Sequence, residues 1–392
     1  MNDKQRTKQY TLSSSDNLPL EIDDPGELIK KITKKITINS TATNLNDLFP
    51  WVELAEKTLE RYKEYDDKLI MCLQYNLARI MFEKLDYNRA KTLMEEAIKK
   101  CIKINSKKLA EYYWLLAIVL CNMGNDYDAE YYVDAKENIE KAIALDKDNP
   151  NNHCVYADIL FGLCEYEEAE NHYKKALEIS IEKRGKDHPK TASFYSSFGI
   201  FYYNLGKYNK ARNYQNKAYR VFRKENGEEN LYTVRILGHI ANLDYNEQKY
   251  ESALKKMKKV FLITGKIKGD DNKETKTCKN NCGEMHVMLK QYDAAINYFT
   301  APFAIVSGKE GLFLLLDYNK DIMSAPQMII SEKGVYAEEL IKIARSRNIP
   351  MTENHALAKG LMKDCVQFQP VLEAYYEPLA KIMAKTGKYE AS

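Results

Sequence analysis

Tyr166-Glu-Glu-Ala169, Tyr208-Asn-Lys-Ala211, Tyr250-Glu-Ser-Ala253 and Tyr292-Asp-Ala-Ala295 follow one another in this chain at a constant interval of 42 residues, without a gap. A second small residue stands twelve positions before each of these alanines, at Ala157, Gly199, Ala241 and Gly283. Two small positions that keep their spacing through four copies indicate an internal repeat, and this repeat decides the fold.

Each copy is best explained as a helical hairpin. Gly199 or its equivalent lies on the first helix and lets the second helix approach closely, and Ala211 supplies the matching small contact. Gly206 or its equivalent falls in the turn between the helices, and we expect Tyr208 to pack over this joint. A single hairpin cannot bury its apolar face, so neighbouring hairpins must stack.

Two further copies precede these four. One is marked by Leu77-Ala78, Tyr87, Ala90 and Ala97, and the next by Leu116-Ala117, Gly124, Ala142 and Asn149-Pro150. The second of them is longer. Asn125 to Asp134 looks like an insertion, in which either Ala129 or Ala135 takes the place of the repeated alanine. The array therefore comprises about six hairpins.

The repeat resembles that of the tetratricopeptide repeat (TPR) family. Its period and the connector Gly185-Lys-Asp-His-Pro189-Lys-Thr191-Ala192 resemble the longer repeats of kinesin light chains, and His188 is expected to order that turn. The resemblance implies a mainly α fold, a TPR α-solenoid, over residues 69–301. Residues 25–68 are expected to form capping helices, with Leu54, Ala55 and Leu59 at helical spacing, and residues 1–24 a disordered segment.

The same resemblance identifies candidate partner-binding residues. In TPR proteins the first helix of each hairpin lines a concave groove that holds a protein partner. Asn side chains there can pair with a peptide backbone, and Tyr gives contact area at low entropy cost. Ordinary polar surface is the alternative interpretation of these positions. The matching residues are Asn76, Arg79, Tyr203, Asn204, Arg235, Asn242, Tyr245, Asn246 and Asn280.

The composition argues against several classes of protein. The 59 Lys and Arg residues against 56 Asp and Glu leave a net charge of +3, too little to hold a nucleic-acid backbone or an anionic membrane. No apolar run is long enough for a membrane span, and residues 1–25 lack the apolar core of a signal peptide. The eight cysteines are scattered, and pairs such as Leu120-Cys121 and Leu163-Cys164 indicate reduced, core-filling thiols in a cytoplasmic protein.

The repeat ends near Ala301, where short apolar runs begin. Residues 303–306, 312–316, 327–331 and 349–351 are predicted strands. Residues 335–345 are predicted to form an amphipathic helix, followed by helices at 355–363 and 371–385. Residues 302–392 are therefore expected to form a small α/β domain.

Several short stretches of this domain occur in a characteristic order and spacing. They are Asp317-Tyr318-Asn319, Met323-Ser324-Ala325-Pro326, Glu332-Lys333-Gly334, Ile343-Ala344, Asn348-Ile349-Pro350 and Glu353-Asn354-x-x-Leu357-Ala358. In this order and spacing they resemble the cytosolic domain of the FlhB/YscU family, the export switch of flagella and type III injectisomes. Members of that family carry four transmembrane helices before this domain, whereas here a TPR array precedes it.

The family's self-cleavage motif is degenerate in this chain. Members cleave themselves at an Asn-Pro-Thr-His loop, where the Asn side chain attacks its own backbone carbonyl. The corresponding positions here are Gly308, Lys309, Glu310 and Gly311. Because no Asn nucleophile is present, we expect that the chain does not cleave itself.

We expect no catalytic residue, no metal site and no cofactor. Cys278, Cys282 and His286 share one helical face and could bind a metal, but Cys282 and His286 fall at packing positions of the repeat and no fourth ligand is evident. The histidines show no recurring relation to a nucleophile, and no phosphate loop or dinucleotide motif occurs. Paired lysines such as Lys255-Lys256 are best explained as a solvated helix face.

These observations predict a non-enzymatic adaptor whose TPR groove binds a protein partner. The C-terminal resemblance implies a role in protein export, with export-apparatus components or export substrates as partners, and a cytoplasmic place beside a membrane export apparatus. No nucleic-acid partner and no direct membrane insertion are expected. The alternative is a TPR scaffold or regulator that is unrelated to secretion.

Overall fold

The computed structural model of the chain describes residues 24–39, 49–126, 128–299, 302–307, 311–318 and 323–385. Residues 1–23 of the expected disordered segment lie outside this part, as do Gly308, Lys309 and Glu310 of the degenerate loop. The chain divides into two compact units, residues 1–201 and 202–392. The second unit contains both the last repeats and the C-terminal domain. The expected boundary between residues 301 and 302 stays a prediction.

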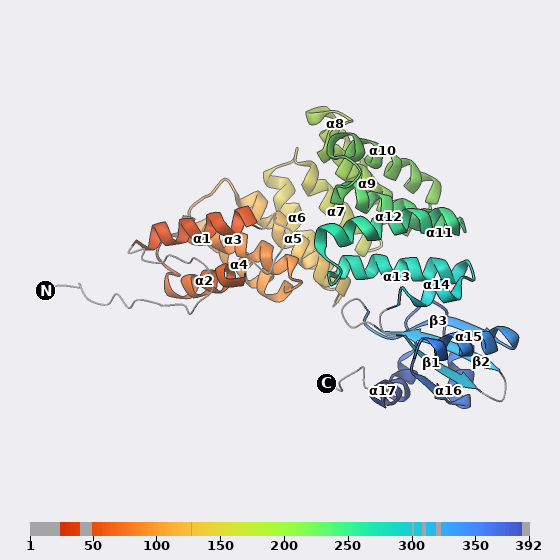
Figure 1. Ribbon diagram of the computed structural model, residues 1–392. Helices are drawn as coiled ribbons and strands as arrows, with labels where there is room; N and C mark the ends of the chain where they lie inside the picture. Colours follow the sequence, from red (N-terminus) through yellow and green to blue (C-terminus); the bar gives the residue numbers. More distant parts are fainter. Residues whose placement is uncertain are drawn as a thin grey trace. The chain divides into compact units, whose positions relative to one another are not determined.

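The first unit begins with the two predicted capping helices and continues with helical hairpins (Figure 1). Helix α9 crosses the division between the units. The helices are α1 Pro25–Asn39, α2 Phe49–Arg61, α3 Asp67–Glu83, α4 Tyr87–Lys103, α5 Leu109–Asp126, α6 Tyr131–Leu145, α7 Pro150–Gly162, α8 Tyr166–Arg184 and α9 Pro189–Asn204.

The second unit continues the array and ends in a small mixed domain. Its helical repeats are α10 Tyr208–Asn226, α11 Leu231–Asn246, α12 Tyr250–Lys268, α13 Lys273–Met288 and α14 Tyr292–Ile296. The domain after them consists of β1 Pro302–Ser307, β2 Leu312–Asp317, β3 Gln327–Lys333, α15 Val335–Ser346, β4 Met351–Glu353, α16 His355–Asp364, a 3₁₀ turn at Glu373–Tyr375 and α17 Tyr376–Lys385.

The turn inside five of the hairpins, all except α5–α6, is built in the same way. Between α7 and α8, Cys164 takes a left-handed conformation (φ 64°), Glu165 N–H donates to Leu160 O and Cys164 N–H donates to Phe161 O. This pair of bonds closes the last turn of the first helix and satisfies carbonyls that would otherwise be unpaired. Gly206 adopts the same conformation at its own turn (φ 69°), as predicted.

The repeated residues occupy the positions that the hairpin interpretation assigns to them. Ala169, Ala211, Ala253 and Ala295 are fully buried. The ring of Tyr208 lies 5.7 Å from that of Tyr203, and Tyr250 lies 5.5 Å from Tyr245. The motif tyrosine therefore packs on an aromatic residue that ends the first helix. An aromatic pair of this kind also joins Phe161 to Tyr166, whereas Val287 takes the place of the first ring before Tyr292.

A glycine at the end of the second helix recurs every 42 residues in three of the hairpins. Gly185, Gly227 and Gly269 end the second helices α8, α10 and α12 with φ between 80° and 88° and ψ between 160° and 178°. Essentially only glycine reaches that region of backbone space. The next first helix starts at a capping residue three positions later. His188 Nδ1 there accepts a hydrogen bond from Lys190 N–H at 3.1 Å, so this residue orders the turn.

The structure decides between two alternatives at the insertion and corrects one expectation about a cysteine. Of the two alanines near the insertion, Ala135 is fully buried on α6, whereas Ala129 is exposed, so Ala135 takes the repeat position. The expectation that Leu163-Cys164 contributes a core thiol was wrong. Cys164 is exposed, because it forms the left-handed turn residue rather than a helix face.

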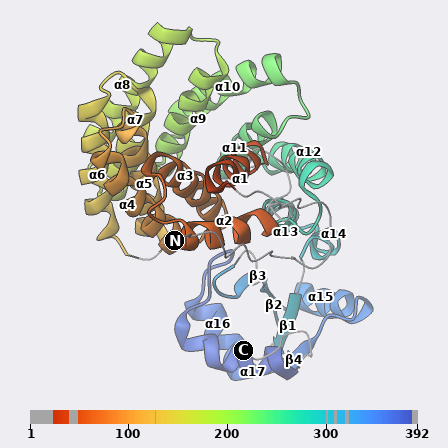
Figure 2. The ribbon, with the colours of Figure 1, turned by 90° about the vertical axis from the view of Figure 1, so that its left-hand side faces the viewer.

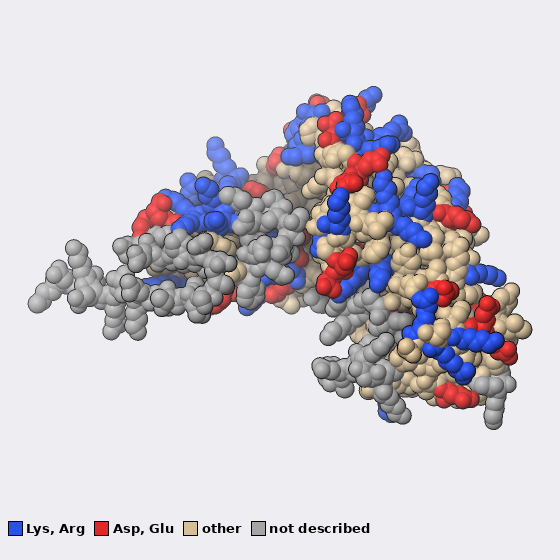
Figure 3. All heavy atoms as spheres, in the orientation of Figure 1, with Lys and Arg blue, Asp and Glu red and all other residues tan. Residues whose placement is uncertain are grey.

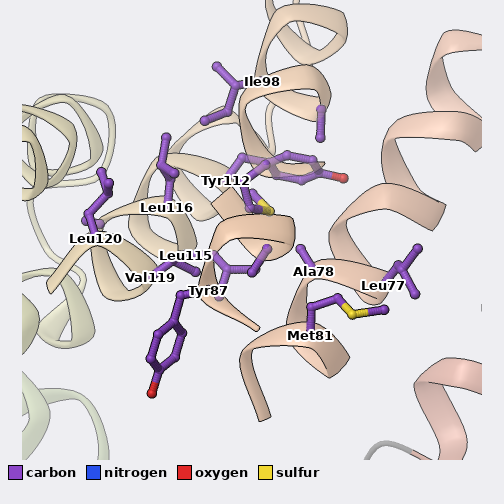
Figure 4. Close-up of a cluster of buried hydrophobic side chains, with 14 of the residues drawn as sticks. Leu77, Ala78, Met81, Tyr87, Ile98, Tyr112, Leu115, Leu116, Val119 and Leu120 are labelled. Carbon is purple, nitrogen blue, oxygen red and sulfur yellow. The ribbon is translucent and has the colours of Figure 1, made fainter. Parts of the chain in front are cut away.

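A continuous hydrophobic core joins α1 to α7 of the first unit, and part of it is drawn in Figure 4. Tyr112 on α5 is only 1% exposed, and its hydroxyl donates to Met71 O on α3 at 3.2 Å. Leu77 and Ala78 of α3 and Leu116 of α5 belong to the same cluster. The repeat residues predicted for the two early copies therefore face one another in the core.

Gly162 is expected to tolerate no side chain. A Cβ at this residue would lie 2.2 Å from Tyr132 Cε1, so Gly162→Ala should lower the free energy of unfolding by about 1–3 kcal/mol through overpacking. Gly238→Ala on α11 is the matched control, because its Cβ would meet only Val260 at 3.8 Å. Urea unfolding should show Gly238→Ala as neutral or stabilising, and equal losses in both variants would contradict the close contact.

The C-terminal domain is a four-stranded sheet with the order β3-β2-β1-β4. β1 and β2 are antiparallel, with Ser307 opposite Leu312, β2 and β3 are antiparallel, and β4 is parallel to β1. All six residues of β2 are buried, as expected for a central strand that is covered on both faces. The fold class expected from the sequence, a TPR α-solenoid followed by a small α/β domain, is confirmed.

Two predicted elements of this domain start later than expected. β4 begins at Met351 rather than at residue 349, because Ile349 N–H closes the end of α15 by donating to Ala344 O and Pro350 has no N–H. The helix predicted from residue 371 begins at Tyr376. Val371 N–H instead donates to Pro326 O, which holds this segment extended beside β3.

The two faces of the sheet are covered by different parts of the chain (Figures 1 and 2). Leu312, Leu314 and Leu316 point to the face that α16 and α17 cover. Phe313 and Leu315 point to the other face, where they join α15 and the last hairpin in one cluster. Val287 of α13, Ile296 of α14 and Phe299 contribute to it. The second unit thus has one apolar core that runs from the last repeat into the sheet.

Candidate partner-binding face

The candidate site is the polar face of the first helices in the second unit, which we call the first-helix face. On α11, Arg235, His239, Asn242 and Asn246 recur every three or four residues and share one side of the helix. The end of α9 contributes from one side and α13 from the other. The face comprises Tyr203, Asn204, Arg235, His239, Asn242, Tyr245, Asn246, Glu274, Asn280 and Glu284.

Tyr203 and Asn246 form a bridge between α9 and α11. Asn246 Nδ2 donates to the Tyr203 hydroxyl at 2.7 Å and to Asn242 O at 2.9 Å. Burial raises the pKa of Tyr203, so its phenol is neutral near pH 7. These two predicted residues therefore hold each other in place, although Asn246 remains exposed.

Arg235 and Glu274 form the equivalent bridge between α11 and α13. Arg235 Nη2 donates to Glu274 Oε1 at 2.9 Å, and Lys268 also pairs with this carboxylate. Burial, reinforced by the Arg235 charge, lowers the pKa of His239 to about 4, so His239 is neutral near pH 7. The face therefore carries one cation here, which is already paired.

The side chains of Asn204 and Asn242, unlike those of Tyr203, Arg235 and Asn246, are not engaged by neighbouring helices within the described chain. Among the residues that the structure describes, neither side chain makes a hydrogen bond within the chain. Asn204 is exposed at the end of α9, and Asn242 is half-buried in the middle of α11. Each amide can offer a donor and an acceptor to a bound backbone.

Asn280 and Glu284 lie together on α13. Asn280 is only 8% exposed, and its Nδ2 donates to Glu284 Oε1 at 3.0 Å. Tyr245 lies close enough for the Glu284 carboxylate to affect its ionisation, and burial followed by Glu284 raises the pKa of Tyr245 to about 12. Burial raises the pKa of Glu284 itself to about 7.

The two predicted residues of the first unit, Asn76 and Arg79, lie on α3. Thr37 of α1 donates to Asn76 Oδ1 at 2.9 Å, and Asn76 Nδ2 donates to Cys72 O at 2.8 Å, so the capping helix engages this amide. Arg79 is half-buried near Tyr75, whose hydroxyl donates to Glu111 of α5 at 2.8 Å. Polar bridges between successive first helices thus occur in this unit too.

The sequence analysis missed Glu284, Glu274 and His239. Glu284 could have been found, because it stands 42 residues after Asn242 and next to the small repeat residue Gly283. The residues carried over from the family were amides, tyrosines and arginines, and they included no acidic residue. Glu274 and His239 carry no such signal, because their roles depend on contacts between helices.

Charge on the described surface is mixed in sign. Figure 3 shows Lys and Arg side chains interspersed with Asp and Glu over the repeats of the second unit. Many of these charges are paired, as in Lys259–Glu228 and Lys266–Glu229. Among the described residues, no helix is both long and apolar enough to span a membrane.

Two family models match the chain. The tetratricopeptide repeat model matches residues 151–224 and 191–253. The FlhB HrpN YscU SpaS family model matches residues 314–385, which begin after the degenerate loop. No curated protein matches this chain.

The chain is similar to several solved structures, one of which, with a TM-score above 0.5, supports the fold assignment. A Rap protein complexed with Competence and Sporulation Factor is 15% identical with a TM-score of 0.51, over 73% of this chain and 86% of that chain. The apo form of RapI is 19% identical (TM-score 0.45, 71% and 77% covered). A putative kinesin light chain from Podosopora anserina with nearly identical TPR-like repeats is 13% identical (TM-score 0.38, 46% and 89% covered). The chain carries tetratricopeptide repeats followed by a domain of the FlhB family.

Proposed function

We propose that this protein is a non-enzymatic adaptor whose first-helix face binds an extended segment of a protein partner. TPR repeats are protein-interaction modules, and the FlhB-family domain points to a role related to protein export. The observation that carries the proposal is the pair of amides at Asn204 and Asn242, which make no hydrogen bond within the described chain. A bound backbone would supply the donors and acceptors that these amides need.

The partner interaction is tested with the full chain as bait. Affinity purification from the source organism followed by mass spectrometry should recover a protein partner. Asn204→Ala combined with Asn242→Ala should weaken its capture roughly tenfold, because each lost hydrogen bond is worth about 0.5–1.5 kcal/mol. Asn213→Ala, on the exposed side of α10, is the matched control and should leave capture unchanged. Equal capture by both variants would remove the first-helix face from the proposal.

The identity of the captured partners tests the export role. We infer from the FlhB-family domain that they include components or substrates of an export apparatus beside the membrane. If the host encodes such an apparatus and none of its proteins is recovered, the chain is a TPR scaffold or regulator outside secretion. That result would leave the binding role of the first-helix face intact.

The C-terminal domain is proposed to be a non-cleaving relative of the export switch. Gly308, Lys309, Glu310 and Gly311 stand where the family has its cleavage motif, and none of them offers an amide side chain as nucleophile. Purified protein should therefore run as one band of 45.5 kDa in SDS-PAGE. Two fragments with a junction near residue 308, mapped by mass spectrometry of the intact chains, would contradict the proposal.

A further inference from the structure

One carboxylate of the first-helix face has no cation of its own. Glu284 is half-buried on α13, and among the described residues no Lys, Arg or His forms an ion pair with it. Its hydrogen bond to Asn280 Nδ2 satisfies one oxygen. A carboxylate in such a place costs free energy unless a positive charge compensates for it.

Two neighbouring carboxylates in the same repeats, unlike Glu284, form ion pairs within the described part of the chain. Asp244 pairs with Arg212 and Lys256, at 2.9 and 2.5 Å. Glu274 pairs with both Arg235 and Lys268. The chain therefore supplies two cations to each of these buried or half-buried acids. Glu284 is the exception among these three acids, and a cation from a bound ligand would supply the charge that the described part of the chain does not.

Tyrosine side chains lie on the neighbouring first helices of the same face. Tyr203 of α9 is fixed by its hydrogen bond from Asn246, and the ring of Tyr245 on α11 packs on that of Tyr250. Both phenols can extend the contact with a bound segment beyond Glu284.

The chemistry favours an organic cation over a metal ion. Calcium and magnesium require several oxygen ligands, and the structure brings together no group of three potential metal ligands within its described part. A single half-buried carboxylate, already bonded to one amide, fits an ammonium or guanidinium group. Both groups occur on the side chains of protein partners.

We propose that Glu284 receives a lysine or arginine side chain of the protein segment that binds the first-helix face. This inference rests on the proposed function and specifies the chemistry of the partner. It predicts that bound sequences carry a basic residue at one fixed position. The amides of Asn204 and Asn242 would hold the backbone around that position.

The test is a selection of random dodecapeptides displayed on phage, with the full-length protein as bait. Selected peptides should share a lysine or arginine at one position, and replacing that residue by glutamine should weaken binding at least tenfold. The isosteric variant Glu284→Gln should bind the same peptides at least tenfold more weakly and should lose the preference for a basic residue. Glu251→Gln, at an exposed position of α12, is the matched control and should bind like the wild type.

The outcomes separate this inference from the proposed function. Peptides that bind, depend on Asn204 and Asn242 and share no basic residue would overturn the inference and leave the proposed function standing. The same holds for basic peptides that Glu284→Gln binds as tightly as the wild type does. If the selection yields no peptide that depends on the first-helix face, both the inference and the proposed function are overturned.

Discussion

Phe299→Ala is expected to lower the free energy of unfolding of the second unit by about 3–5 kcal/mol, the usual loss for a buried Phe in a packed core. Phe299 is 5% exposed and follows the short helix α14. Its ring packs so closely on Gly283 of α13 that a Cβ there would lie 2.8 Å away. It also belongs to the cluster that contains Phe313 and Leu315 of the sheet. One substitution therefore loosens the last repeat and the C-terminal domain together.

Hydrogen exchange followed by mass spectrometry can show this coupling. Phe299→Ala should speed exchange both in α13 and in β2, since they share one core. Leu262→Ala is the control, because this side chain on α12 is 68% exposed and its loss should change stability by less than about 0.5 kcal/mol. Faster exchange confined to α13, with β2 unaffected, would mean that the domain folds independently of the array.

The core shared by the last hairpin and the sheet should also determine which fragments of the chain are soluble. Polar contacts reinforce the shared core, since Tyr292 donates to Glu332 at 2.5 Å and Arg347 pairs with Asp293 at 2.7 Å. A fragment that begins at residue 302 would expose the sheet face which the last hairpin covers. We expect it to be less soluble than a fragment that begins at residue 231, before α11. Native light scattering of the two fragments checks this, and equal solubility would contradict it.

The sequence predicted the array well because its signal is local and repeated. Small residues at Ala157, Gly199, Ala241 and Gly283 keep their spacing, and each hairpin repeats the same backbone hydrogen bonds. The sheet strands were also predicted, since β2 is apolar along its whole length. The shared core could not be predicted, because it depends on which side of the sheet the short helix α14 meets.

The candidate site was predicted less well, for a physical reason. Repeat spacing identifies which residues lie on the first helices, and it placed Tyr203, Asn242 and Asn246 on one face. It does not tell which of these side chains are used within the chain. Tyr203 and Asn246 bond to each other across two helices, and Arg235 binds Glu274. Pairings of that kind arise from the stacking of successive repeats, which a single sequence does not specify.

Glu284→Gln is expected to make the free protein more stable at pH 8 and to leave its stability at pH 5 nearly unchanged. Burial raises the pKa of Glu284 to about 7 from an ordinary value of 4.5. An acid with a raised pKa binds its proton more tightly in the folded state, so wild-type stability falls as the pH rises from 4.5 to about 7. The loss is complete above pH 7 and amounts to roughly 3 kcal/mol. Glutamine keeps the hydrogen bond to Asn280 and cannot ionise.

The comparison of variant and wild type isolates this one group. His239, with a pKa of about 4, and Tyr245, with a pKa of about 12, keep the same charge between pH 5 and pH 8. Asp158 in the first unit also has a raised pKa, of about 6, but its contribution cancels because both proteins contain it. Urea unfolding followed by circular dichroism at several pH values gives the difference directly.

The result bears on the proposed cation site as well as on stability. A gain at pH 8 means that the chain retains an acidic residue that weakens its own fold, which is the usual cost of a binding residue that awaits its ligand. A basic peptide bound at Glu284 should remove this penalty and raise wild-type stability at pH 8 above that of Glu284→Gln with the same peptide. If Glu284→Gln is instead less stable at pH 8, the carboxylate is already compensated within the chain, and a ligand cation has no charge to neutralise there.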